Sequence, residues 1–131
     1  MIEIKNIYKK FGKLEVLNNI NLSFKKGECI ALIGPNGCGK TTLIKSILGM
    51  VIPTKGDILF DQKSILKEFK YRENIGYMPQ IGRYPDYMTV GQIIEMIKKI
   101  RNSEQVLDED LIKSFELEKI VDKQMRTLSG G

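Results

Sequence analysis

The feature that most constrains this chain is a glycine-rich stretch, Gly34-Pro35-Asn36-Gly37-Cys38-Gly39-Lys40-Thr41. It fits the pattern G-x-x-x-x-G-K-[ST], which a chain of this length matches by chance on the order of once in a few hundred sequences. An apolar run at residues 29–33 precedes the stretch and predicts a strand covered on both faces. A helical pattern at residues 40–48 follows it. Strand, loop and helix in this order are the context that phosphate binding requires.

Each residue type in this loop has a chemical reason. Glycines at 34, 37 and 39 permit backbone angles that a side chain would forbid, so several N–H groups can converge on phosphate oxygens. The following helix directs its positive N-terminus at the same anion. Lys40 supplies a cation for the β- and γ-phosphates, and the Thr41 hydroxyl can bind Mg²⁺. An ordinary glycine-rich turn is the alternative, but the flanking patterns favour a nucleoside triphosphate site.

The remaining patterns predict a mixed first two-thirds and a helical last third. Period-2 or apolar runs predict strands at residues 2–8, 19–24, 56–60 and 74–78. Apolar residues at helical spacing predict helices at residues 89–101, 107–115 and 118–122. Thr89 and Gln92 form a capping box at the start of the first of these helices. The fold class is therefore α/β.

Composition narrows the function. The chain of 131 residues has no histidine, which excludes histidine-based catalysis and most zinc sites. The net charge of +5 comes from lysine pairs interrupted by acidic or apolar residues, so a solvated basic surface is favoured over a nucleic-acid site. Cys29 and Cys38 lack a C-x-x-C spacing, and we expect reduced thiols. Without an apolar run of about 18 residues or a signal peptide, we expect a cytoplasmic chain.

Three stretches, taken in order, resemble the ATP-binding cassette family. The glycine-rich loop continued by Thr42-Leu43 is similar to the family's Walker A motif. Ile75-Gly76-Tyr77-Met78-Pro79-Gln80 resembles the strand that leads into its Q-loop, and Leu128-Ser129-Gly130-Gly131 resembles the start of its signature motif. Their order and approximate spacing match, so the resemblance covers the whole chain.

The resemblance implies a fold and an organisation. The fold would be a P-loop NTPase core with N-terminal antiparallel β strands and a C-terminal helical subdomain, in an incomplete form. Residues 1–86 would hold the β subdomain and the P-loop core. Residues 87–131 would form the helical subdomain up to the signature motif.

The resemblance also implies roles for individual residues. Phe11 would stack on adenine, although a core phenylalanine at a strand end is an alternative reading. Residues 34–42, with Lys40, Thr41 and Thr42 on the phosphates and Mg²⁺, would bind ATP. Gln80 would touch Mg²⁺ or the attacking water, and the segment after it would couple to a membrane permease. Ser129, Gly130 and Gly131 would clasp the γ-phosphate bound in a second ATP-binding subunit, in a head-to-tail dimer at the inner face of the membrane.

The chain also departs from the family. The family continues after the signature with a strand ending in Asp-Glu and a loop carrying a catalytic histidine, and neither is present. We therefore expect the N-terminal part of a transporter ATPase that binds nucleotide with negligible turnover. In the family, strands that follow the signature motif lie on both sides of the strand that is expected here at residues 29–33. We therefore expect the strand at residues 29–33 to expose unpaired edges. The alternatives are a soluble ATPase of the same superfamily acting on nucleic acid or ribosomes, which usually carries two cassettes or a coiled-coil insertion, and a non-catalytic fragment that only folds.

Overall fold

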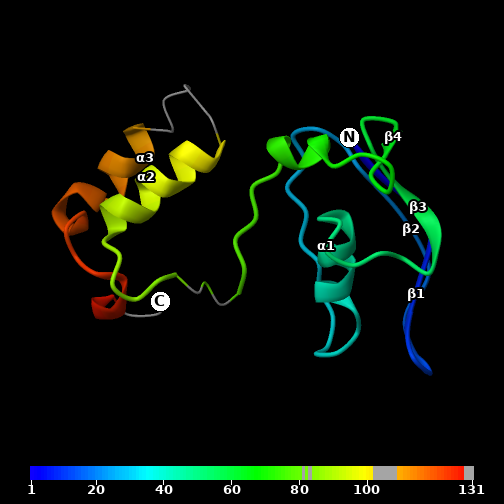
Figure 1. Cartoon of the computed structure of the whole chain (residues 1–131). Helices are drawn as coiled ribbons and strands as arrows, with labels where there is room; N and C mark the ends of the chain where they lie inside the picture. Colours follow the sequence, from blue (N-terminus) through cyan, green and yellow to red (C-terminus); the bar gives the residue numbers. More distant parts are fainter. Residues whose placement is uncertain (81, 83, 102–108, 129–131) are drawn as a thin grey trace. The chain divides into compact units, whose positions relative to one another are not determined.

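The computed structural model describes residues 1–80, 82, 84–101 and 109–128 (Figure 1). The chain divides into two compact units, Met1–Gly76 and Tyr77–Gly131, and each is described by itself. The subdomain boundary that the resemblance implies, between residues 86 and 87, stays a prediction.

An antiparallel sheet forms the frame of the first unit. Its strands are β1 (Ile2–Phe11), β2 (Leu14–Phe24), β3 (Lys55–Phe60) and β4 (Lys63–Ser64), in the spatial order β2-β1-β3-β4. The strands predicted at residues 2–8, 19–24 and 56–60 are confirmed. β1 and β2 are longer than predicted because their pairing continues to the turn, where Phe11 faces Leu14.

Local backbone geometry directs the sheet's apolar residues to one face. Gly12 opens the two-residue β1–β2 turn with a φ of +58°, which tight hairpin turns favour. The register shifts between Ile4 and Ile7, and Asn6 between them has a φ of +49°. This bulge lets Ile4 and Ile7 both reach the core, although an odd spacing in a regular strand would place them on opposite faces.

Helix α1 (Lys40–Ile47) follows the glycine-rich loop and lies to one side of the sheet (Figure 1). Leu43 on this helix joins Leu17 and Ile58 in the buried core, as its apolar face predicts. The helix is capped at Leu48, and Gly49 follows with a φ of +67°. The predicted helix and its glycine stop are therefore confirmed.

A 3₁₀ helix, η1 (Lys70–Asn74), holds the far end of α1. The Arg72 guanidinium donates a hydrogen bond of 2.9 Å to the Gly49 carbonyl oxygen and lies 4.9 Å from the centre of the Phe69 ring. A cation at this position also suits the negative end of the helix dipole. The ring of Tyr71, 9% exposed, packs beside Arg72 and completes the contact.

The segment at residues 28–33, called the arm below, corrects one prediction. The sequence predicts a strand at residues 29–33, but no strand forms there. Among the described residues, no backbone hydrogen bond involves residues 29–33. The expected exposure is confirmed, because Ile30, Leu32 and Ile33 are 50, 42 and 90% exposed. A strand forms only where a second segment supplies its hydrogen-bond partners, and no described strand pairs with the arm.

The strand predicted at residues 74–78 is wrong for the same reason. Asn74 ends η1, and residues 75–79 have no regular structure. Beside the arm runs an apolar groove of about 880 Å³. Its apolar lining includes Leu22, Phe24, Ile30, Leu32, Ile44 and Ile47.

Helices dominate the second unit, as predicted. They are α2 (Val90–Arg101), α3 (Glu109–Ser114) and the 3₁₀ helices η2 (Leu117–Ile120) and η3 (Met125–Thr127). In place of the helix predicted at residues 118–122, the structure has the 3₁₀ helix η2, which begins one residue earlier. No described helix is long and apolar enough to cross a membrane.

Helix α2 begins at the predicted capping box. The Thr89 N–H donates to Gln92 Oε1 at 2.9 Å, and the Gln92 N–H donates to Thr89 Oγ1 at 3.2 Å. The Gly91 N–H donates to the Val121 carbonyl at 2.9 Å, and a β-carbon on Gly91 would lie 2.7 Å from the Val121 side chain. At the helix surface, Lys99 binds Glu95 at 2.7 Å and lowers the pKa of that carboxyl.

Candidate phosphate-binding site

The glycine-rich loop, residues 34–39, joins the arm to α1. Residues 34–38 are exposed, and Gly37 and Gly39 have φ angles of +82° and +98°. Both angles lie in the left-handed region that only glycine adopts without strain. The loop therefore turns sharply and presents its backbone to solvent at the start of the helix.

The loop and the first turn of α1 offer a group of unpaired donors. Gly39 is the N-cap of α1 and no side chain caps the helix, whose first hydrogen bond to the loop runs from the Leu43 N–H to Gly39 O at 2.8 Å. Among the described residues, no partner is found for the N–H groups of Gly37, Gly39, Lys40, Thr41 and Thr42. Unpaired N–H groups at a helix N-terminus bind anions. A polyphosphate fits this donor set.

Close contact with β2 fixes the loop's helix end. A β-carbon on Gly39 would lie 2.8 Å from the Val16 carbonyl oxygen and 3.1 Å from the Leu17 side chain. Glycine is therefore required at this position for packing as well as for its backbone angle. No sequence motif marks Val16, because its contact with the loop depends on how the sheet packs against α1.

Lys40 bends back over the loop. Its ammonium donates to the carbonyl oxygens of Gly34 and Pro35, at 2.7 Å each, and lies 3.7 Å from Cys38 Sγ. The charge is therefore inside the loop, at the place where the unpaired N–H groups would hold phosphate. The side chain must exchange these carbonyl oxygens for phosphate oxygens when an anion binds.

The threonines after Lys40 differ in exposure. Thr41 is exposed, and Thr42 is partly buried. The Thr42 carbonyl accepts a 2.8 Å hydrogen bond from Ser46 Oγ, and Ser46 is fully buried. The described residues contain no cluster of acidic, cysteine or histidine side chains that could hold a metal alone. A Mg²⁺ ion at Thr41 would therefore take most of its ligands from phosphate oxygens and water.

Phe11 lies at the tip of the β1–β2 hairpin. Its side chain is 50% exposed, which does not fit the alternative of a core phenylalanine. The Lys9 ammonium lies 4.9 Å from the centre of the ring. Lys9 could not be predicted from the sequence, because no motif marks it.

The other predicted site residues do not belong to the first unit. Gln80 belongs to the second unit and is exposed. Ser129, Gly130 and Gly131 lie outside the described residues. Within the first unit, the structure brings together the loop residues, and Phe11 belongs to the hairpin whose Val16 packs against Gly39.

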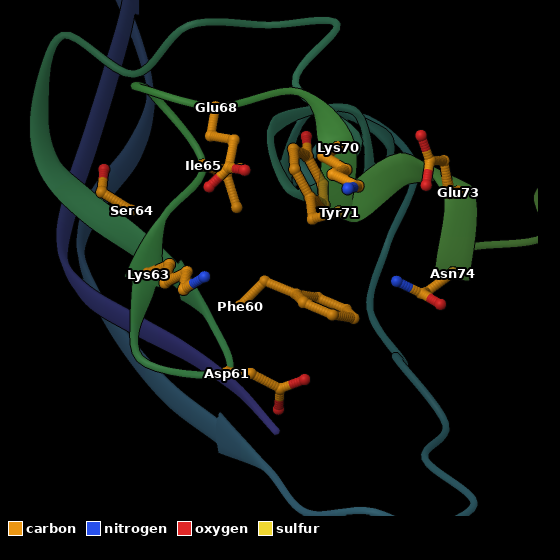
Figure 2. Close-up of a pocket in the computed structure, with 10 residues that line it drawn as sticks. All are labelled: Phe60, Asp61, Lys63, Ser64, Ile65, Glu68, Lys70, Tyr71, Glu73 and Asn74. Atoms are coloured by element: carbon orange, nitrogen blue, oxygen red, sulfur yellow. The ribbon is translucent and has the colours of Figure 1, made fainter.

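A smaller pocket of about 230 Å³ lies in the first unit, between β3, β4 and η1 (Figure 2). The rings of Phe60 and Tyr71 line it with centroids 5.8 Å apart. Lysines and acidic residues alternate around its rim: Asp61, Lys63, Glu68, Lys70 and Glu73. The mixed charges give this pocket no preference for an anion, in contrast to the glycine-rich loop.

Comparison with known proteins agrees with this geometry. A P-loop NTPase fold is shown by a solved structure titled "Structure of ATP binding subunit of ABC transporter", with a TM-score of 0.86 at 24% identity over 98% of this chain and 56% of that one. A second, a putative ABC transporter ATP-binding protein from Pyrococcus furiosus, has a TM-score of 0.81 at 26% identity over 99% of this chain and 64% of that one. The expected fold class is confirmed.

The sequence comparisons give the family. The profile of the family described as "ABC transporter" matches residues 17–131, so the chain belongs to this family. It is 40% identical to a zinc import ATP-binding protein of Rickettsia conorii, over the whole chain and 52% of that protein. It is 36% identical to a sulfate/thiosulfate import ATP-binding protein of Pectobacterium atrosepticum, over 99% of the chain and 42% of that protein. The chain thus spans about half the length of these relatives or less.

Proposed function

We propose that this chain binds ATP with Mg²⁺ at the glycine-rich loop, as part of the ATP-binding subunit of a membrane transporter. The observation that carries the proposal is the convergence of unpaired N–H groups, the α1 N-terminus and the Lys40 ammonium on one exposed loop. Lys40 would neutralise the β- and γ-phosphates, while the backbone donors hold their oxygens. The Thr41 hydroxyl would hold Mg²⁺, which offsets phosphate charge when bound.

The remaining site roles are proposals from the resemblance. Phe11 would stack on adenine, which its exposure supports. Gln80 would contact Mg²⁺ or the attacking water, and Lys40 and Gln80 would be the groups on this chain that act in hydrolysis. Residues 129–131 would contact nucleotide bound in a second ATP-binding subunit. By itself the chain of 131 residues would bind nucleotide with negligible turnover, because it contains no histidine.

The names of the relatives support a proposal for the partner of this protein and for its location in the cell. Their names describe ATP-binding proteins for zinc and sulfate import, so we propose a partner permease and a position at the cytoplasmic face of the membrane. The alternative, a soluble ATPase acting on nucleic acid or ribosomes, has no support among these relatives. Co-purification of a permease, as opposed to ribosomes, would distinguish the two.

Titration of the chain with a fluorescent ATP analogue and Mg²⁺ tests the binding proposal. Lys40→Ala should weaken binding about 10- to 100-fold, because a charge-assisted contact with the phosphates is lost. Lys45→Ala is a matched control on the same helix and should leave the affinity within about twofold. Equal affinities of the wild type and the Lys40→Ala variant would contradict the proposal.

A further inference from the structure

The ring of Phe11 is held by a cation that no family motif marks. Lys9 Nζ lies 4.9 Å from the centre of the ring, within the range of a cation–π contact. The same ammonium donates a 2.7 Å hydrogen bond to the Ile52 carbonyl, 43 residues away in the sequence. Lys9 is partly buried, whereas the adjacent Lys10 is exposed. Two independent partners therefore fix the Lys9 side chain.

The carbonyl that anchors Lys9 is itself part of a fixed segment. The Thr54 N–H donates to the Tyr8 carbonyl at 2.7 Å, and the Lys10 N–H donates to Thr54 Oγ1 at 3.2 Å. The connection between α1 and β3 is thus fastened to β1 on both sides of Lys9. Ile52 O gives the ammonium a defined position, so Lys9 can restrict the ring.

The hairpin brings Phe11 close to the glycine-rich loop. Val16 on β2 contacts Gly39, and Leu14, two residues along the strand, is the cross-strand partner of Phe11. Two strand residues span about 7 Å and a cross-strand pair about 5 Å. By this path Phe11 is at most roughly 12 Å from Val16, the residue that packs against the loop, and a nucleoside triphosphate bound by its phosphates can span such a distance.

We propose that Lys9 is a positioning residue, which presets the Phe11 ring for stacking on the base of the bound nucleotide. The inference rests on the proposed function and concerns the base end of that site. The cation lies over one face of the ring, and Phe11 is still 50% exposed to solvent, which leaves ring surface for a ligand. A ring already held in place loses less conformational freedom on binding, which raises affinity.

Comparison of two ligands tests this role. Mg²⁺–ATP carries a base, and inorganic tripolyphosphate carries only the phosphates. Lys9→Met should weaken ATP binding about three- to fivefold and leave tripolyphosphate binding unchanged, because only the stacking contact depends on Lys9. Lys9→Arg keeps the cation and should restore most of the ATP affinity. Lys10→Met is the matched control, because it removes the same charge from the adjacent residue. In the wild type Lys10 pairs with Glu15, so the Lys10→Met variant should bind both ligands as tightly as the wild type does.

A double variant makes the test specific to the ring. If Lys9 acts through Phe11, then Lys9→Met should have no further effect on ATP affinity in a Phe11→Ala background. Equal loss for both ligands, or an undiminished effect in the Phe11→Ala background, would overturn the proposal, and so would no loss for either ligand. A wild-type chain that binds neither ligand would instead refute the proposed function. Thermal unfolding of each variant separates these outcomes from a folding defect.

Discussion

The two segments that flank the glycine-rich loop are held in opposite ways. On one side, α1 makes its own backbone hydrogen bonds, buries Leu43 and is fastened at its end by Arg72. On the other side, residues 29–33 of the arm are all apolar and make no backbone hydrogen bonds among the described residues. The difference shows that apolar character alone does not order a segment. A helix supplies its own partners, whereas a strand must find them in another segment.

The largest expected effect is on stability, where a leucine of α1 is compared with a leucine of the arm. Leu43→Ala should lower the free energy of unfolding by about 2–5 kcal/mol, because it leaves a cavity in the core. Leu32→Ala removes the same atoms from a side chain that is 42% exposed, and should cost about 1 kcal/mol or less. Urea unfolding followed by circular dichroism measures both. Similar losses would mean that the arm is packed as firmly as α1.

A pair of glycines sharpens the comparison within the loop. Alanine is strained at positive φ, and this backbone strain alone should contribute about 1–2 kcal/mol to the cost of both Gly37→Ala and Gly39→Ala. A β-carbon at Gly37 meets open space, but at Gly39 it meets the Val16 carbonyl at 2.8 Å. Gly39→Ala should therefore cost about 1–3 kcal/mol more. Equal thermal shifts for the two variants would show that the loop is not fixed against β2.

The alkylation rates of the two cysteines distinguish the arm from the loop. Both thiols are exposed, Cys29 in the arm and Cys38 in the loop. Mg²⁺–ATP at ten times its Kd should slow alkylation of Cys38 about tenfold, because only the unliganded fraction reacts. Alkylation of Cys29 should keep its rate, as measured by mass spectrometry of the two peptides. Protection of both thiols would mean that the nucleotide orders the arm directly.

Local patterns predicted the parts of the fold that form from local interactions. The loop, α1 with its Gly49 stop, and the capping box at Thr89 all depend on residues within a few positions of one another. The hairpin strands were predicted because their apolar alternation reflects one buried face. The strand predicted at residues 29–33 does not form, because its backbone needs partners that no local pattern encodes.

The site was predicted in the same uneven way. The glycine-rich loop is a continuous motif, so its residues could be named from the sequence. The contacts of Val16 with Gly39 and of Lys9 with Ile52 join residues 23 and 43 positions apart. They follow from strand register and from the path of the chain after α1, neither of which a motif contains.

The unpaired arm has an energetic consequence for the loop that it joins. Because no backbone hydrogen bond among the described residues fixes residues 29–33, which lead into the loop, a nucleotide must select one among the conformations that these residues allow, and this selection costs entropy. A segment that paired with the arm would remove those conformations beforehand, and would raise the affinity for nucleotide without touching it. By linkage, a bound nucleotide would favour pairing of the arm by the same factor.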